Sequence, residues 1–222
     1  MPTSLEQAQS LFRAGRYLDI VTQSEYSDRD LVSLQPEHRA LLAHALFSAG
    51  RVERARQIVE RERERAIGVI RSRYELIAGL LCRNAAQQAQ ALRHFNAAYQ
   101  IAHEHGESVD TAWAALHRFR LLAQLHPLDE LAPMLAEVRR HVSKTGDPYA
   151  TTVMHDAVAL MEASVGRTEE ARRHLEISSS LIRDFPNAGL EQMVLVSSSY
   201  VDFFEYKFQK AVDHLNAARR LT

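Results

Sequence analysis

Few of the side chains able to do chemistry are spaced so that they would act together. The chain has 222 residues, with eleven histidines and one cysteine, Cys82. His103 and His105 form the closest histidine pair, and on a helix residues two apart point to nearly opposite sides. Cys82 follows an apolar run and is expected to be a buried structural thiol. We therefore expect no catalytic residue, no metal and no cofactor.

Sequence motifs and net charge exclude further classes of function. The chain contains no glycine-rich phosphate loop, no nucleophile elbow and no HExxH pair. Its 27 basic and 28 acidic side chains give a formal net charge of −1. No overall field therefore attracts nucleic acid or an anionic membrane, and electrostatic recognition must come from a local patch.

The segment from Arg61 to Arg65 is a local run of charged residues. Its acids and bases alternate, which on a helix would place Glu60 beside Arg63 and Glu62 beside Arg65. Because acids balance bases, we expect a solvated helix face and not a nucleic-acid surface.

The chain shows no targeting or membrane segment. Residues 1–7 carry neither a basic stretch nor an apolar one, so they do not resemble a secretory signal. No apolar run approaches the roughly 18 residues of a membrane span. We expect a cytoplasmic protein.

Helices are the elements that must position any functional side chain. The 8 glycines and 6 prolines fall between helix-periodic segments, and β-type alternation is almost absent. At residues 146–148 a glycine, an aspartate and a proline predict a helix end, an N-cap and the next helix start. The prediction is an all-α fold with tight turns.

A repeat lies on top of this helical pattern. Every second predicted helix carries an apolar stripe at i, i+4, i+7 and i+11: Ala91-Phe95-Ala98-Ala102, Leu131-Leu135-Val138-Val142, Ala171-Leu175-Ser178-Ile182 and Ala211-Leu215-Ala218. Ile20 and Ala55 lead earlier equivalents, and the leading positions follow at steps of 35, 36, 40, 40 and 40. Such regular spacing indicates repeated helical hairpins.

The residues before each stripe resemble the tetratricopeptide repeat family. Ala8, Leu11, Gly15, Arg16, Tyr17 and Ile20 recur as Ala43, Leu46, Gly50, Arg51, Val52 and Ala55, and in part as Ala159, Gly166, Arg167 and Ala171. The resemblance implies a right-handed α-solenoid of six hairpins and twelve main helices, in a single domain over residues 1–222. The hairpins would span about 4–25, 36–66, 69–105, 108–143, 148–184 and 188–222. Phe119 departs from the pattern, since a small residue is expected there.

The same resemblance implies where a partner would bind. First helices line the concave side of such arrays, and the matching positions here include Gln9, His44, Arg73, Arg83, Trp113, His117, Arg120 and Tyr200. We expect the three arginines to form a basic strip that favours an acidic partner segment. The aromatic residues have an alternative role, packing between hairpins. The lysine and asparagine clamp of chaperone-tail binders is absent.

Two functions follow as expectations. The first is a non-catalytic protein- or peptide-binding scaffold that uses the concave groove. The alternative is an N-terminal sensor or regulatory domain of a larger bacterial transcription or signalling regulator, whose helical-repeat arrays the 40-residue steps resemble. Because no helix follows to cover the stripe of Ala211, Leu215 and Ala218, we also expect a continuation beyond Thr222 or self-association through the last hairpin.

Overall fold

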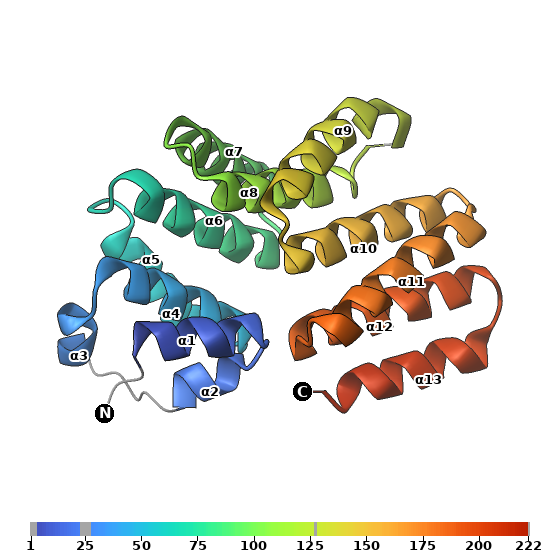
Figure 1. The fold of residues 1–222 in the computed structure, drawn as a ribbon, viewed down its shortest axis with the longest axis horizontal. Helices are drawn as coiled ribbons and strands as arrows, with labels where there is room; N and C mark the ends of the chain where they lie inside the picture. Colours follow the sequence, from blue (N-terminus) through green and yellow to red (C-terminus); the bar gives the residue numbers. More distant parts are fainter. Residues whose placement is uncertain (1–3, 23–27, 127, 222) are drawn as a thin grey trace. The chain divides into compact units, whose positions relative to one another are not determined.

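The computed structural model describes residues 4–22, 28–126 and 128–221, and within these ranges the chain forms helices and no strand (Figure 1). The helices are α1 Leu5–Arg13, α2 Tyr17–Thr22, α3 Asp28–Ser33, α4 Pro36–Ser48, α5 Val52–Glu62, α6 Gly68–Asn84, α7 Gln88–Glu104, α8 Ser108–Leu122, α9 Leu128–Thr145, α10 Pro148–Ser164, α11 Thr168–Asp184, α12 Ala188–Phe204 and α13 Phe208–Arg219. The predicted all-α, repeat-like fold is confirmed. The predicted hairpin limits at residues 25 and 222 lie outside the described residues.

The helices divide into two compact units, Met1–Leu121 and Leu122–Thr222. In the first unit α1 pairs with α2, α4 with α5 and α6 with α7, and each hairpin packs on the next. In the second unit α10 pairs with α11 and α12 with α13, while α9 packs on α10. The hairpin predicted over residues 108–143 has its first helix in one unit and its second helix in the other. A single domain and a right-handed superhelix stay predictions.

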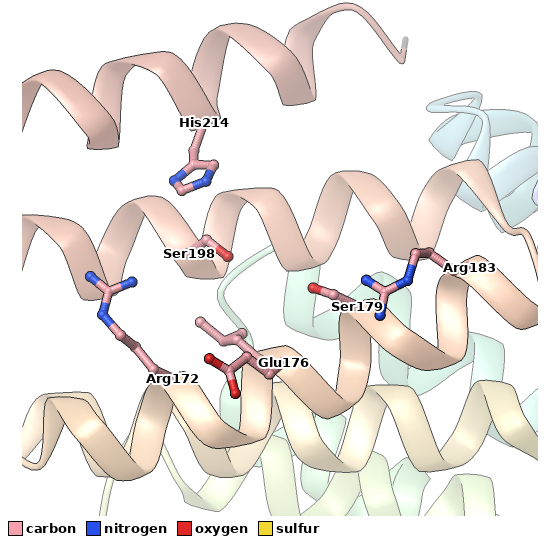
Figure 2. A pocket seen from close by; sticks show the side chains of 7 residues that line it. Arg172, Glu176, Ser179, Arg183, Ser198 and His214 are labelled. Atoms are coloured by element: carbon pink, nitrogen blue, oxygen red, sulfur yellow. The ribbon is translucent and has the colours of Figure 1, made fainter.

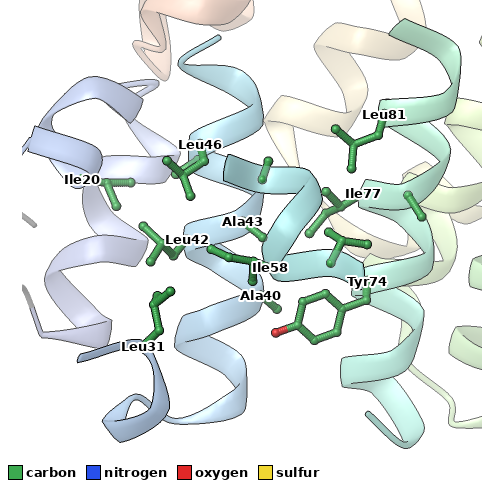
Figure 3. Close-up of a cluster of buried hydrophobic side chains, with 14 of the residues drawn as sticks. Ile20, Leu31, Ala40, Leu42, Ala43, Leu46, Ile58, Tyr74, Ile77 and Leu81 are labelled. Carbon is green, nitrogen blue, oxygen red and sulfur yellow. The ribbon is translucent and has the colours of Figure 1, made fainter. Parts of the chain in front are cut away.

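Helix α3 was not among the twelve predicted helices, so the described residues contain thirteen. It follows the first hairpin and buries Leu31 in the core of the first unit, in one cluster with Ile20 and Leu42 (Figure 3). Repeat spacing did not predict this helix because a single buried leucine has no periodic partner.

The predicted stripes are the core of the second helices. In α7 all four stripe residues, from Ala91 to Ala102, are fully buried, and the stripes of α9 and α11 are buried as well. The exception is Leu215 on α13, which is 48% exposed, whereas Leu175, 40 positions earlier on α11, is 5% exposed. Leu175 belongs to a core cluster that also includes Val194 and Val201 of α12. Leu215 lacks such cover.

The turns inside the hairpins share one backbone device. The second residue after the first helix takes a positive φ, as at Gly50 (+76°) and Gly166 (+81°). The next amide then donates to the carbonyl five residues back, as from Arg51 to Leu46 at 2.8 Å. Glycine suits this left-handed position because a Cβ atom is strained there. In the last hairpin the same position is filled by Tyr206, at φ +59°.

One close helix contact depends on the absence of a side chain. Gly79, in the middle of α6, lies against the ring of Phe95 on α7, and a Cβ atom at position 79 would lie 2.4 Å from Cε1 of that ring. The small residue expected in the first helix of each hairpin therefore has a direct steric reason here.

Candidate functional site

Two arginines and two histidines from three first helices gather in the first unit. His44 lies on α4, Arg83 on α6, and His117 and Arg120 on α8; we call these four residues the basic cluster. Partial burial, together with the neighbouring charge of Arg120, lowers the pKa of Arg83 to about 10. The guanidinium of Arg83 has no hydrogen bond or ion pair with any residue in the described ranges. The cluster therefore concentrates positive charge in a poorly solvated place.

The histidines of the basic cluster are neutral at pH 7. Burial lowers the pKa of His44 to about 4. Burial, and then the charges of Arg83, Arg120 and His44, hold the pKa of His117 well below its usual range. Neutral imidazoles keep hydrogen-bonding capacity without adding charge, so the arginines carry the positive charge of this surface.

Aromatic rings surround the histidines of the basic cluster. The ring of Phe12 packs on His44 with 4.8 Å between centroids. Trp113 and Phe95 both stack on His117, at 5.9 and 5.5 Å. Phe95 is fully buried and belongs to the core, whereas Phe12 and Trp113 are partly exposed. The buried Nδ1 atom of His117 has no hydrogen-bond partner among the described residues.

Three other residues predicted to line the groove, Arg73, Gln9 and Tyr200, are not part of the basic cluster. Arg73 forms an ion pair with Asp110 of α8, with 3.2 Å between Nη2 and Oδ2, so its charge is compensated within the chain. The expected strip of three arginines is thus reduced to Arg83 and Arg120. Gln9 lies exposed on α1, and Tyr200 lies on α12 of the second unit, where it packs edge-on against Phe204 at 4.8 Å.

The expectation of a solvated helix face at residues 61–65 was wrong in part, because Arg61, Glu62 and Arg63 are partly buried, whereas Glu64 and Arg65 are exposed. Helix α5 ends at Glu62, so the spacing argument does not apply to Arg63 and Arg65. Glu62 instead pairs with Arg39 of α4 at 2.9 Å, and both side chains are largely buried. The charged run is part of an ion-pair network that joins neighbouring hairpins.

Glu75 on α6 is the centre of a second part of this network. It accepts hydrogen bonds from Arg71 at 2.8 Å and is paired with His94 of α7 at 2.7 Å. Burial raises the pKa of this carboxyl group, but the hydrogen bond from His94 and the charges of Arg63, His94 and Arg71 outweigh burial and lower it. This arrangement stabilises the contact between α6 and α7. Spacing along one helix did not predict the pair of Glu75 and His94, because the two residues lie on different helices, 19 positions apart.

A pocket of about 260 Å³ lies between α11, α12 and α13 of the second unit (Figure 2). Its lining residues are Arg172, Leu175, Glu176, Ser179, Arg183, Ser198 and His214. Arg172 is already bound to Asp202 at 2.6 Å and to Glu205, and His214 is hydrogen-bonded to Asp202 at 2.8 Å. Arg172 and His214 are therefore engaged in holding the three helices together.

The cysteine and the possible metal ligands do not form a reactive site among the described residues. Cys82 is a free, buried thiol, as predicted, and burial raises its pKa. Over the described ranges, no three histidine, cysteine, aspartate or glutamate side chains lie close enough to hold a metal ion. None of the described helices is long and apolar enough to cross a membrane.

Comparison with known proteins shows the fold alone. No family model matches the chain, and no curated protein matches it. Four chains of solved structures match, among them the crystal structure of BtubC (BKLC) from P. vanneervenii. That likeness has a TM-score of 0.59 and 15% identity, and it covers 99% of this chain and 91% of that chain. The chain is thus similar to BtubC in its arrangement of helices.

Proposed function

We propose that this chain is a non-catalytic scaffold whose first unit binds an acidic segment of a protein or peptide at the basic cluster. The observation that carries the proposal is the position of Arg83. Its guanidinium is partly buried beside a second arginine and has no carboxylate partner among the described residues. A carboxylate from a partner would supply the missing counter-charge.

The energetics favour an anionic ligand over an apolar one. Desolvating a guanidinium without an opposite charge is costly, and a second arginine nearby adds like-charge repulsion. An aspartate or glutamate side chain relieves both costs, because the planar guanidinium offers paired donors that match a carboxylate. Phe12 and Trp113, partly exposed around the cluster, would contact apolar parts of the same segment.

The fold supports a binding role for this surface. Stacked helical hairpins bring side chains from successive first helices onto one extended surface. Here α4, α6 and α8 each contribute to the basic cluster. A binding site built from three rigid helices needs no catalytic group and selects partners by charge and shape.

The test is a selection from a random-peptide phage library on the whole chain. Selected peptides are expected to be enriched in aspartate and glutamate, and to lose binding to an Arg83→Met variant. Arg93→Met is the matched control, since Arg93 is an exposed arginine on the second helix α7 of the same unit. Peptides without acidic residues, or equal binding to both variants, would contradict the proposal.

A further inference from the structure

The last hairpin carries an uncovered apolar surface. Helices α12 and α13 lie side by side (Figure 1). Val196, Tyr200 and Phe203 follow one another at helical spacing on α12, and Phe208, Val212 and Leu215 do so on α13. Each of these six side chains is between 44% and 57% exposed. With Phe204 and Tyr206, they form what we call the α12–α13 face.

The aromatic rings of the α12–α13 face form one continuous patch. Tyr200 contacts Phe204, Phe204 contacts Phe203, Phe203 contacts Phe208, and Phe208 contacts Tyr206, with centroids 4.8 to 6.2 Å apart. Taking about 200 Å² for a whole aromatic side chain, the face leaves roughly 700 Å² of mainly apolar surface open. The largest patch on a typical monomer is smaller, about 300–600 Å².

Tyr206 adds the most exposed ring to this face, at an unusual backbone position. It takes the left-handed backbone position, φ +59°, that Gly15, Gly50 and Gly166 fill in other hairpins and that Ala86 fills, at φ +58°, in the hairpin of α6 and α7. The strained position is used in the same way, because the next amide, Lys207, donates to Asp202 O at 2.8 Å. Tyr206 is 81% exposed, so packing within the chain does not offset that strain. Where the other hairpins have glycine or the small Ala86, this one has a large exposed ring, which is explained if the ring contacts another molecule.

The repeat indicates what kind of molecule fits. The stripe position of Leu215 is filled on α11 by Leu175, which is covered by the following helix α12. Because it repeats the stripe that α12 covers on α11, the α12–α13 face is the kind of surface that another helical hairpin covers. A second copy of this chain presents such a hairpin.

We propose that two copies of the chain associate through their α12–α13 faces, in a two-fold symmetric contact. In such a contact the same surface of both copies is buried. A stable protein–protein interface buries about 800 Å² per partner, which the open area of this face approaches.

The experiment measures the mass of the whole chain in solution by light scattering across about a hundredfold dilution. The natural chain is expected to have the mass of a dimer at the higher concentrations, and Leu215→Glu the mass of a monomer throughout. Leu18→Glu is the matched control, because Leu18 on α2 is also a 48% exposed leucine, and it should leave the dimer intact. Circular dichroism checks that both variants stay helical.

Three results would overturn the proposal. A natural chain that is monomeric at every concentration would leave the face to a different partner. Equal loss of the dimer in Leu215→Glu and Leu18→Glu would move the contact elsewhere. The third is an unchanged dissociation constant in Tyr206→Gly, which relieves the strained backbone but removes the ring and is expected to weaken the dimer at least about tenfold.

Discussion

Replacing Gly79 by alanine tests the helix packing on which the basic cluster depends. In a solvent-exposed helix, replacing glycine by alanine stabilises the folded state by about 1 kcal/mol, because glycine is the poorer helix former. Here the new Cβ atom would lie 2.4 and 2.5 Å from Cε1 and Cδ1 of Phe95, whose ring is fully buried. Overpacking a core in this way typically costs about 1–3 kcal/mol. Since a rigid ring has little room to move, we expect a net loss of about 1–2 kcal/mol.

The assay is urea unfolding followed by circular dichroism, with Phe95→Leu as the second arm of a double-mutant cycle. Leucine lacks the outer ring atoms, so in that background Gly79→Ala should become neutral or stabilising. The coupling energy between the two positions should then be about 2 kcal/mol. If Gly79→Ala stabilises the otherwise natural chain, the close approach of α6 and α7 is not as described.

Three further predictions concern stability. Leu175→Ala should cost about 2–5 kcal/mol as a core truncation, whereas Leu215→Ala, at the matching exposed position, should cost under about 1 kcal/mol; equal costs in urea unfolding would refute the repeat register. The pKa values of His44 and His155 are lowered to about 4 by burial, helped at His155 by the charges of His174 and Arg139, so these histidines bind protons more readily when unfolded. The free energy of unfolding should therefore fall as pH drops from about 6.5 to about 4, with a shallower fall in His44→Gln, and a flat profile would contradict their burial. Arg83→Met should raise the free energy of unfolding by about 0.5–2 kcal/mol, because it removes a poorly solvated charge, and a lower melting temperature would refute this.

Most of the fold could be predicted from the regular spacing of apolar residues along the sequence. The stripe of Phe95 in α7 and that of Leu175 in α11 are buried, because a fixed spacing of apolar residues has only one arrangement that removes them from water. Gly50 and Gly166 lie in the left-handed turn positions, where glycine has a steric reason. Helix α3 was not predicted, since its burial depends on one leucine that meets a core built from other segments.

Charged residues were predicted less well, because their partners come from other helices. Spacing along one helix suggested that Glu62 pairs with Arg65, yet it pairs with Arg39 of α4 and with the neighbouring Arg61. Arg73 belonged to the expected binding strip, but Asp110, 37 residues later, binds it. Of the expected arginine strip, Arg83 and Arg120 lie together, with His44 and His117. The proposed site is thereby narrowed from eight predicted residues to four residues on three helices.

Reversing a charge on the chain, and then the matching charge on a bound peptide, tests the proposed function most directly. The measurement is the fluorescence anisotropy of a labelled acidic peptide from the library selection, titrated with the natural chain, Arg83→Glu and the control Arg93→Glu. We predict that Arg83→Glu weakens binding at least about tenfold and that a lysine-substituted peptide regains part of the loss, while Arg93→Glu binds like the natural chain. Equal affinity of all three proteins for the acidic peptide would contradict binding at the basic cluster.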